Sequence, residues 1–174
     1  MAEDKENWTM NRRTFMLSGA ALASIGGFYA LRPSNTEAIA SDGVFEVTYT
    51  EQEWRTLLTP EQYAVLREEA TERPYTSDLL NEKREGTYNC AGCNQPLYQS
   101  STKFDSRTGW PSFYDALPDA VATKTDYKLI FPRTEVHCSR CGGHLGHVFN
   151  DGPPPTGLRH CINGIALTFE PQAA

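Results

Sequence analysis

Two Cys-x-x-Cys pairs constrain this chain more than any other feature. They are Cys90 with Cys93 and Cys138 with Cys141, and 44 residues separate them. Each pair presents two sulfur atoms to one point, which is the spacing of tetrahedral zinc sites. A shared ion would join distant parts of the chain and offset the entropy of closing the loop between them. We therefore expect one structural Zn²⁺ with every coordination position filled by protein, although iron also binds four thiolates.

The first forty residues resemble a targeting segment. Arg12-Arg13 precedes a run of apolar and small residues from Met16 to Leu31, as in a twin-arginine export signal. Ala38-Ile39-Ala40 offers a small-x-small cleavage site. The apolar run is short for a membrane span, so a cleaved signal is favoured over an uncut anchor. We expect residues 1–40 to be a signal that directs export to the periplasm, and residues 41–174 to be the folded domain.

Export affects the interpretation of the cysteines. In an oxidising compartment the Cys-x-x-Cys pairs could be disulfides instead of metal ligands. The twin-arginine route carries proteins that are already folded and often metal-loaded, so zinc could be inserted in the cytoplasm. Two pairs together favour a shared metal over two disulfides.

The charge balance argues against one class of function. The 174 residues carry a formal net charge of −6. A protein that binds nucleic acid normally has a basic face, so we expect no nucleic-acid partner.

Sequence patterns predict two helices followed by short strands. Phe45–Tyr49 alternates apolar and polar residues, as a strand does. A capping box opens a helix over Glu51–Leu58, and a second capping box with proline at the first helical position lies in Thr59–Gln62. From Thr87 onward, short alternations between turn residues indicate antiparallel strands. These include Leu97–Tyr98, Tyr127–Phe131 and Ile165–Phe169.

Cys161, the fifth cysteine, has no cysteine partner in the sequence and is a candidate nucleophile. If Leu158–Thr168 forms one strand, Arg159, Cys161 and Asn163 share a face, and His160 points away. Arg159 would then favour the thiolate, and Asn163 could donate a hydrogen bond to a polar substrate group. The alternative interpretation is a buried and inert thiol.

His144 and His147 follow the second cysteine pair. They could be metal ligands, but four cysteines already suffice. Since an unperturbed histidine titrates near neutrality, we predict that they line the site as proton donors. Asp151 is close enough in sequence to orient one of them. A structural role for at least one histidine remains open.

Trp110 stands between glycine and proline in Gly109–Phe113. This setting predicts a rigid aromatic wall for an apolar group. Taken alone, such a tryptophan would more often belong to the core.

Taken in order, these motifs resemble the methionine-R-sulfoxide reductase B family. The set comprises Cys-x-x-Cys, Gly-Trp-Pro-Ser-Phe, a second Cys-x-x-Cys, His-Leu-Gly-His-Val-Phe, Asp-Gly-Pro and Arg-x-Cys-Ile-Asn, and it spans about Val47 to Phe169. Each motif is weak alone, but the ordered set is specific. The resemblance implies a mainly β fold, with two antiparallel sheets, N-terminal helices and a structural zinc. It also implies reduction of methionine-R-sulfoxide, free or in proteins, to methionine.

The resemblance implies a role for each candidate residue. Cys161 matches the nucleophile whose thiolate attacks the sulfoxide sulfur and becomes a sulfenic acid. Trp110 matches the residue that holds the substrate methyl group, and Phe149 is assigned to the same binding site. Residues that match those binding or protonating the sulfoxide oxygen are His144, His147 and Asn163. Asp151 matches a supporting acid, and Arg159 belongs to the motif of the nucleophile.

Two positions depart from the family's pattern. Many members carry a resolving cysteine two residues before the tryptophan, where this chain has Thr108. No other cysteine is free, so we expect an external thiol, such as a thioredoxin-like protein, to reduce the sulfenic acid of Cys161. His160 replaces a common aromatic residue such as tyrosine, and we expect little effect because it should face away from the site.

Two other functions remain open. The chain could be a zinc-ribbon-like binding module with an inert Cys161, or a thiol–disulfide oxidoreductase that uses one Cys-x-x-Cys pair. The favoured hypothesis is a monomeric reductase whose partners are its sulfoxide substrate, a thiol reductant and the twin-arginine export machinery.

Overall fold

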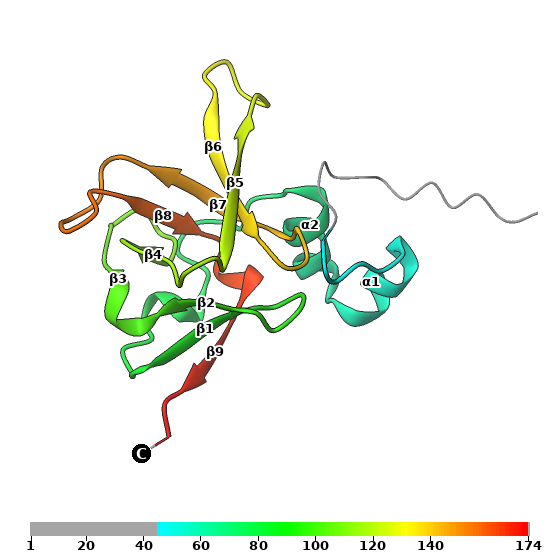
Figure 1. Ribbon diagram of the computed structural model, residues 1–174, viewed down its shortest axis with the longest axis horizontal. Coiled ribbons are helices and arrows are strands. Elements are labelled where there is room, and N and C mark those ends of the chain that lie inside the picture. The colour runs from blue at the N-terminus through cyan, green and yellow to red at the C-terminus, as the bar shows by residue number, and fades with distance from the viewer. Residues whose placement is uncertain (1–44, 174) are drawn as a thin grey trace, which may run out of the picture. The chain divides into compact units, whose positions relative to one another are not determined.

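The computed structural model describes residues 45–173 (Figure 1). The predicted signal at 1–40, with its cleavage site, lies outside the described residues. Within 45–173, none of the helices has the length and apolar character that crossing a membrane requires.

Two short helices, α1 (Glu51–Leu57) and α2 (Pro60–Glu68), open the described chain. Both begin at the predicted capping boxes, in which Thr50 and Thr59 exchange hydrogen bonds with the third residue of the helix. These bonds satisfy N–H groups that the start of a helix leaves free. The two predicted helices are therefore confirmed, and α1 ends one residue earlier than predicted because Leu58 is its extended cap.

The predicted strand at Phe45–Tyr49 is wrong, because this segment is irregular. It crosses the turn of the second cysteine pair instead of lying along a sheet edge. Its Val47 amide donates to the Arg140 carbonyl at 3.0 Å, and the Phe45 ring packs edge-on against His137. The alternation of apolar residues reflects packing on this turn.

In residues 45–173, nine strands form two antiparallel sheets, which confirms the predicted mainly β fold with N-terminal helices. One sheet has the order β2-β1-β9, from Pro96–Gln99, Gly86–Cys90 and Leu167–Pro171. The other has the order β3-β4-β8-β7-β6-β5. Its strands are β3 (Lys103–Phe104), β4 (Ser112–Phe113), β5 (Val121–Asp126), β6 (Arg133–Cys138), β7 (His144–Phe149) and β8 (Arg159–Ile162). The same part of the chain has three single 3₁₀ turns, η1 (Asp78–Leu80), η2 (Ser100–Thr102) and η3 (Gly164–Ala166).

Aromatic side chains from both sheets meet in the core. The ring of Tyr98 on β2 stacks on Phe113 of β4 with centroids 4.3 Å apart, and Tyr88 of β1 meets the same ring edge-on at 4.9 Å. All three residues are fully buried. Each such pair adds about 0.5–1.5 kcal/mol beyond the burial of apolar area. This cluster fixes β4, and hence the loop that precedes it, against the smaller sheet.

Two predicted strands are corrected by the structure. Tyr127–Phe131 forms the turn between β5 and β6, and its four apolar side chains are exposed. The Asp126 carboxylate accepts the Lys128 amide at 2.8 Å, which closes this turn despite the apolar alternation. Leu158–Thr168 is also not one strand, since β8 ends at Ile162 and η3 separates it from β9.

Candidate active site and metal centre

The cysteines of the two Cys-x-x-Cys pairs lie together at one point, although 44 residues separate the pairs in the sequence. Their Sγ atoms all lie within 4.8 Å of one another. The Sγ of Cys90 is 3.7 Å from that of Cys141, and the Sγ of Cys93 is 3.6 Å from that of Cys138. Sulfur atoms bound at about 2.3 Å to a tetrahedral ion would lie about 3.8 Å apart. The described donor set therefore suits one metal ion.

Matching turns present the two cysteine pairs. The Asn94 amide donates to the Cys90 carbonyl at 2.8 Å, and the Gly142 amide donates to the Cys138 carbonyl at 2.9 Å. Asn94 and Gly142 both have left-handed backbones, with φ of 57° and 69°. Hydrogen bonds among the crowded thiols lower the pKa of Cys138 and raise the pKa values of Cys90 and Cys141. Four thiolates this close repel one another, so all four ionise together only with a cation at the centre.

The thiol of Cys161 is half-buried and faces a separate cavity of about 120 Å³. Cys161 pairs with His147 across β7 and β8, and with Ser112 across β8 and β4. The cavity lining brings together the predicted residues Cys161, Trp110, His147, Phe149 and Asn163, and adds Thr71, Arg133 and Gly146. The accessible thiol lies among polar and aromatic groups, unlike an inert core cysteine.

His147 is held by an acid that sequence reasoning missed. Its Nε2 lies 2.8 Å from Oδ2 of the buried Asp126, which also accepts Arg133 Nη2 at 2.6 Å. A carboxylate only accepts hydrogen bonds, so Nε2 carries a proton. Burial lowers the pKa of His147, and the bond to Asp126 opposes that effect. The pKa of Asp126 is held well below its usual range, first by the Lys128 amide and then by His147.

His144 lies behind His147 and is absent from the cavity lining. It is buried, its Nδ1 lies 2.9 Å from Glu135 Oε1, and its ring meets that of His147 edge-on at 5.5 Å. Of the two predicted proton donors, the structure therefore brings only His147 to the cavity. The open structural interpretation fits His144.

Asp151 does not orient a histidine, contrary to the sequence prediction. It is exposed, and its two oxygen atoms accept Arg159 Nε and Nη2 at 2.8 and 2.9 Å. Asp126 and Glu135 contact the histidines instead. The missed signal is strand pairing, which places Glu135 on β6 beside β7 and Asp126 on β5 beside β6.

Arg159 and His160 take opposite directions from β8, as predicted. The Arg159 guanidinium lies over the Phe149 ring, 4.4 Å from its centroid. Its pKa is raised, first by the hydrogen bonds to Asp151 and then, to a smaller extent, by Cys161. His160 is buried on the other face, with Nδ1 3.2 Å from the Tyr98 hydroxyl.

Glu72, in the segment after α2, fixes two cavity residues and was also missed. Its carbonyl accepts Trp110 Nε1 at 2.9 Å, and its amide donates to Asn163 Oδ1 at 2.8 Å. Its carboxylate accepts the Gly164 amide at 2.6 Å. Asn163 caps η3 instead of extending β8, and its Nδ2 donates to the Leu145 carbonyl at 2.9 Å. An amide nitrogen has two N–H groups, so one stays free for a ligand.

Comparison with known proteins decides the family of this chain. The family described as "SelR domain" matches residues 58–171. The chain is 54% identical over 127 residues to "Peptide methionine sulfoxide reductase MsrB" of Methanosarcina barkeri, which covers 72% of this chain and 89% of that protein. The chain belongs to the methionine-R-sulfoxide reductase B family.

Other relatives in the methionine-R-sulfoxide reductase B family extend this similarity. The protein of the same name from Agrobacterium fabrum is 53% identical over 127 residues, which cover 72% of this chain and 94% of that protein. "Peptide methionine sulfoxide reductase B1, chloroplastic" of Arabidopsis thaliana is 55% identical over 119 residues, which cover 68% of this chain and 59% of that protein. The predicted resemblance is confirmed, and the chain is an oxidoreductase of this family.

Proposed function

We propose that the chain reduces methionine-R-sulfoxide, free or in proteins, to methionine, with Cys161 as the nucleophile. One observation carries the proposal. The accessible Cys161 thiol shares its cavity with Trp110 and His147. These three side chains supply what the reaction needs, which is a nucleophile, an apolar surface for the methyl group and a proton donor for the oxygen.

The proposed first step transfers oxygen from substrate to enzyme. The Cys161 thiolate attacks the sulfoxide sulfur, while His147 donates a proton to the sulfoxide oxygen. The oxygen leaves the substrate sulfur and ends on Cys161, which becomes a sulfenic acid as methionine is released. The substrate sulfur gains two electrons and the cysteine sulfur loses two. The Asp126 carboxylate holds His147 through Nε2, so it positions the donor without touching substrate.

Recycling of the sulfenic acid is proposed to need external thiols. A first thiol displaces water and forms a mixed disulfide with Cys161, and a second thiol releases Cys161 in its reduced form. Thr108 supports this route because its hydroxyl stands 3.8 Å from the Cys161 sulfur and cannot form a disulfide. A thioredoxin-like protein is the proposed reductant.

A structural zinc is proposed for the four-cysteine centre. Cys90, Cys93, Cys138 and Cys141 would supply all four ligands, so the ion would have no open position for substrate. When bound, it supplies only a link between the turn after β1 and the turn after β6. The thiols of this centre would then not take part in thiol–disulfide exchange.

Export to the periplasm is proposed from the sequence alone. Arg12-Arg13, the apolar run and the small residues at 38–40 are typical of a twin-arginine signal. Comparison of the N-terminus of the protein recovered from a periplasmic fraction with the encoded N-terminus tests both export and cleavage.

Turnover of separated sulfoxide epimers tests the proposed function. Methionine-R-sulfoxide should be reduced with dithiothreitol or a thioredoxin-like protein, and the S epimer should not. Wild-type protein and Cys161→Ser are compared after both have been loaded with zinc. No turnover by the wild type, or full turnover by Cys161→Ser, would leave the zinc-ribbon-like binding module as the better hypothesis.

A further inference from the structure

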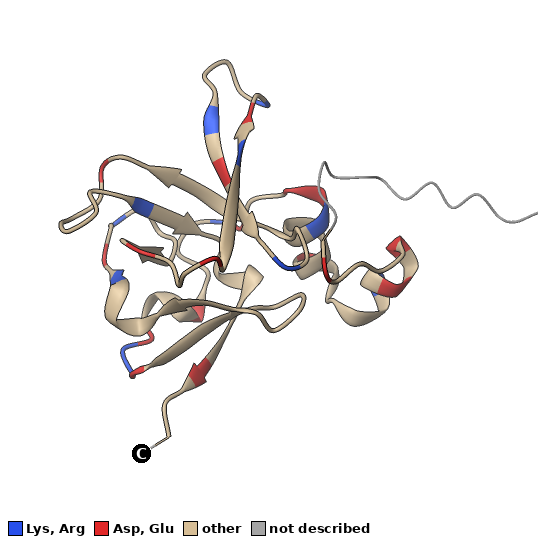
Figure 2. Cartoon of the chain, in the orientation of Figure 1, with Lys and Arg blue, Asp and Glu red and all other residues tan. Residues whose placement is uncertain are grey.

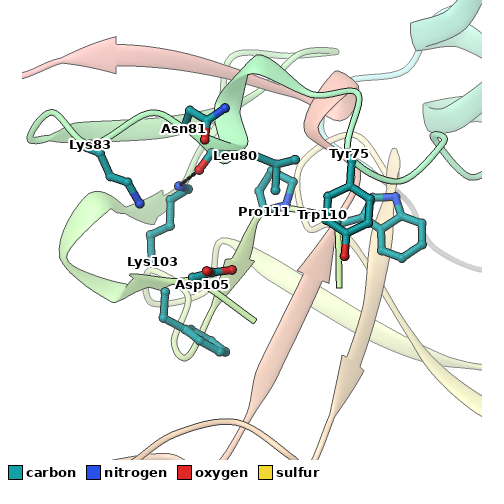
Figure 3. Close-up of a pocket in the computed structure, with 10 residues that line it drawn as sticks. Tyr75, Leu80, Asn81, Lys83, Lys103, Asp105, Trp110 and Pro111 are labelled. Carbon is teal, nitrogen blue, oxygen red and sulfur yellow. Dashed lines mark hydrogen bonds between the residues drawn. The ribbon is translucent and has the colours of Figure 1, made fainter. Parts of the chain in front are cut away.

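Figure 3 shows a second and larger cavity, of about 310 Å³, with Trp110 in its lining. Trp110 also lines the Cys161 cavity. The lining of the larger cavity combines an aromatic wall with charged side chains from three segments of the chain. The residues that matter here are Tyr75, Lys83, Lys103, Asp105 and Trp110. The proposed reaction uses none of them except Trp110.

Tyr75 is an aromatic residue that the fold holds in an exposed position. Its side chain is 70% exposed, and its backbone is left-handed with φ of 64°, which is strained for a tyrosine. Two bonds hold it there, from its amide to the Gly109 carbonyl and from its hydroxyl to the Arg107 carbonyl, each at 2.8 Å. The ring is therefore positioned in advance beside Trp110, where it can contact a ligand at little entropic cost.

Two lysines give the far end of this cavity a positive charge. Lys103 Nζ donates to the carbonyl oxygens of Leu80 and Glu82 at 3.0 and 3.1 Å. These bonds fix the ammonium group and leave its third N–H free. The pKa of Lys103 is lowered, first by burial and then by the nearby charge of Lys83. Asp105 is the one acid in the lining. The charge of Glu82, which also acts on Lys103, is paired with Arg84, so the two lysines carry the excess charge.

We propose that this cavity binds the polypeptide segment next to methionine sulfoxide in a peptide substrate, and that Lys83 and Lys103 bind a carboxylate of that segment. The proposal rests on the proposed function. A substrate whose sulfoxide enters the Cys161 cavity would extend past Trp110, which lines both cavities, and reach Tyr75. Figure 2 shows basic and acidic residues interspersed over the described chain. The attraction for a carboxylate at this cavity would therefore come from the local pair of lysines and not from a basic surface of the whole domain.

Capped peptides with a central methionine-R-sulfoxide test the proposal. The flanking positions carry glutamate, glutamine or lysine, and a further glutamine peptide has a free carboxyl terminus. We expect kcat/KM to be about threefold to fivefold higher with glutamate than with glutamine, which is the effect of one partly exposed charge pair. Lysine should lower kcat/KM below the glutamine value. A gain for the peptide with the free terminus alone would assign the carboxylate to a chain end.

Three variants locate the effect. Lys83→Gln should remove the preference for glutamate, whereas Arg55→Gln, an equal loss of charge on α1, should retain it. Tyr75→Asn, which tolerates a left-handed backbone, should raise KM for every peptide. Turnover of N-acetylmethionine-R-sulfoxide, which is too short to reach the lysines, should be unchanged in Lys83→Gln and in Arg55→Gln.

Two results would overturn the proposal. In the first, the wild type turns over neither the glutamate peptide nor the peptide with the free carboxyl terminus faster than the capped glutamine peptide. In the second, the preference survives in Lys83→Gln. Either result would leave the proposed function standing if N-acetylmethionine-R-sulfoxide is still reduced. Absence of turnover with every substrate would instead overturn the proposed function, and this proposal with it.

Discussion

The hydroxyl oxygen of Thr108 lies 3.8 Å from the thiol sulfur of Cys161. The same hydroxyl bonds to Ser106 Oγ at 2.8 Å, and Ser106 Oγ in turn bonds to Ser112 Oγ at 2.7 Å. A chain of three hydroxyl groups thus ends at the proposed nucleophile, and its last hydroxyl belongs to the position where many family members carry a thiol. The side chain at position 108 is therefore next to Cys161, and threonine has no sulfur atom with which to form a disulfide.

Thr108→Cys is expected to create an intramolecular disulfide with Cys161 during turnover. The new thiol would attack the sulfenic acid and release water. One turnover without external reductant, followed by alkylation and peptide mapping, measures the disulfide. Ser106→Cys is the matched control, because Ser106 contacts Thr108 and Ser112 but not Cys161. Finding the disulfide equally in both variants, or in neither, would contradict the expectation.

Asp126→Asn is expected to lower kcat/KM by about tenfold to a hundredfold. General acid catalysis contributes roughly 10²–10⁴, and this variant removes the carboxylate that holds the donor without removing the donor itself. Asp151→Asn is the matched control, since Asp151 is exposed and contacts Arg159 instead of a histidine. Steady-state kinetics with methionine-R-sulfoxide compares the two variants. An equal loss in both would restore Asp151 as the supporting acid.

The contrast between Asp126 and Asp151 shows where sequence reasoning ended. Local patterns predicted the capping boxes and both cysteine pairs, because a few neighbouring residues determine those geometries. Asp126 reaches His147 only through the register of β5, β6 and β7, which depends on non-local pairing. The apolar run at Tyr127–Phe131 favoured a strand at the place where the hairpin turns. Asn163 lies outside β8 for a similar reason. The backbone amide of Glu72, which is distant in sequence, donates to its side-chain oxygen.

The turnover rate is expected to fall as pH rises through the pKa of His147. Burial lowers that pKa below the ordinary value of 6.5, so the charged, proton-donating form is present only at more acidic pH. The bond to Asp126 raises the pKa, so Asp126→Asn should move the falling limb to still lower pH. Profiles of kcat against pH at saturating reductant locate the falling limb in the wild type and in Asp126→Asn. A shift to higher pH in Asp126→Asn would contradict this assignment.

Glu72→Ala is expected to raise KM and to lower the free energy of unfolding by about 1–3 kcal/mol. The Gly164 amide would lose its acceptor, and an unpaired buried donor costs about that much. Trp110 and Asn163 both bond to the backbone of Glu72, so a displaced segment would loosen the cavity. Urea denaturation and kinetics measure the two effects. Glu68→Ala, which breaks an exposed ion pair with Arg55, should change the stability by at most about 1 kcal/mol.

Removal of the metal is expected to unfold the protein, not only to inactivate it. The purified chain should hold one zinc ion, which elemental analysis measures. The centre links the turn after β1 to the turn after β6, two segments that belong to different sheets. Without the ion, four crowded thiols remain in a largely buried site, and the link between the sheets is lost. Cys93→Ser should therefore lower the melting temperature and reduce activity in proportion to the folded fraction. Cys161→Ser, in contrast, should abolish activity and leave both the zinc content and the melting temperature unchanged. A Cys93→Ser protein that stays folded without zinc would show that packing alone holds the two sheets together.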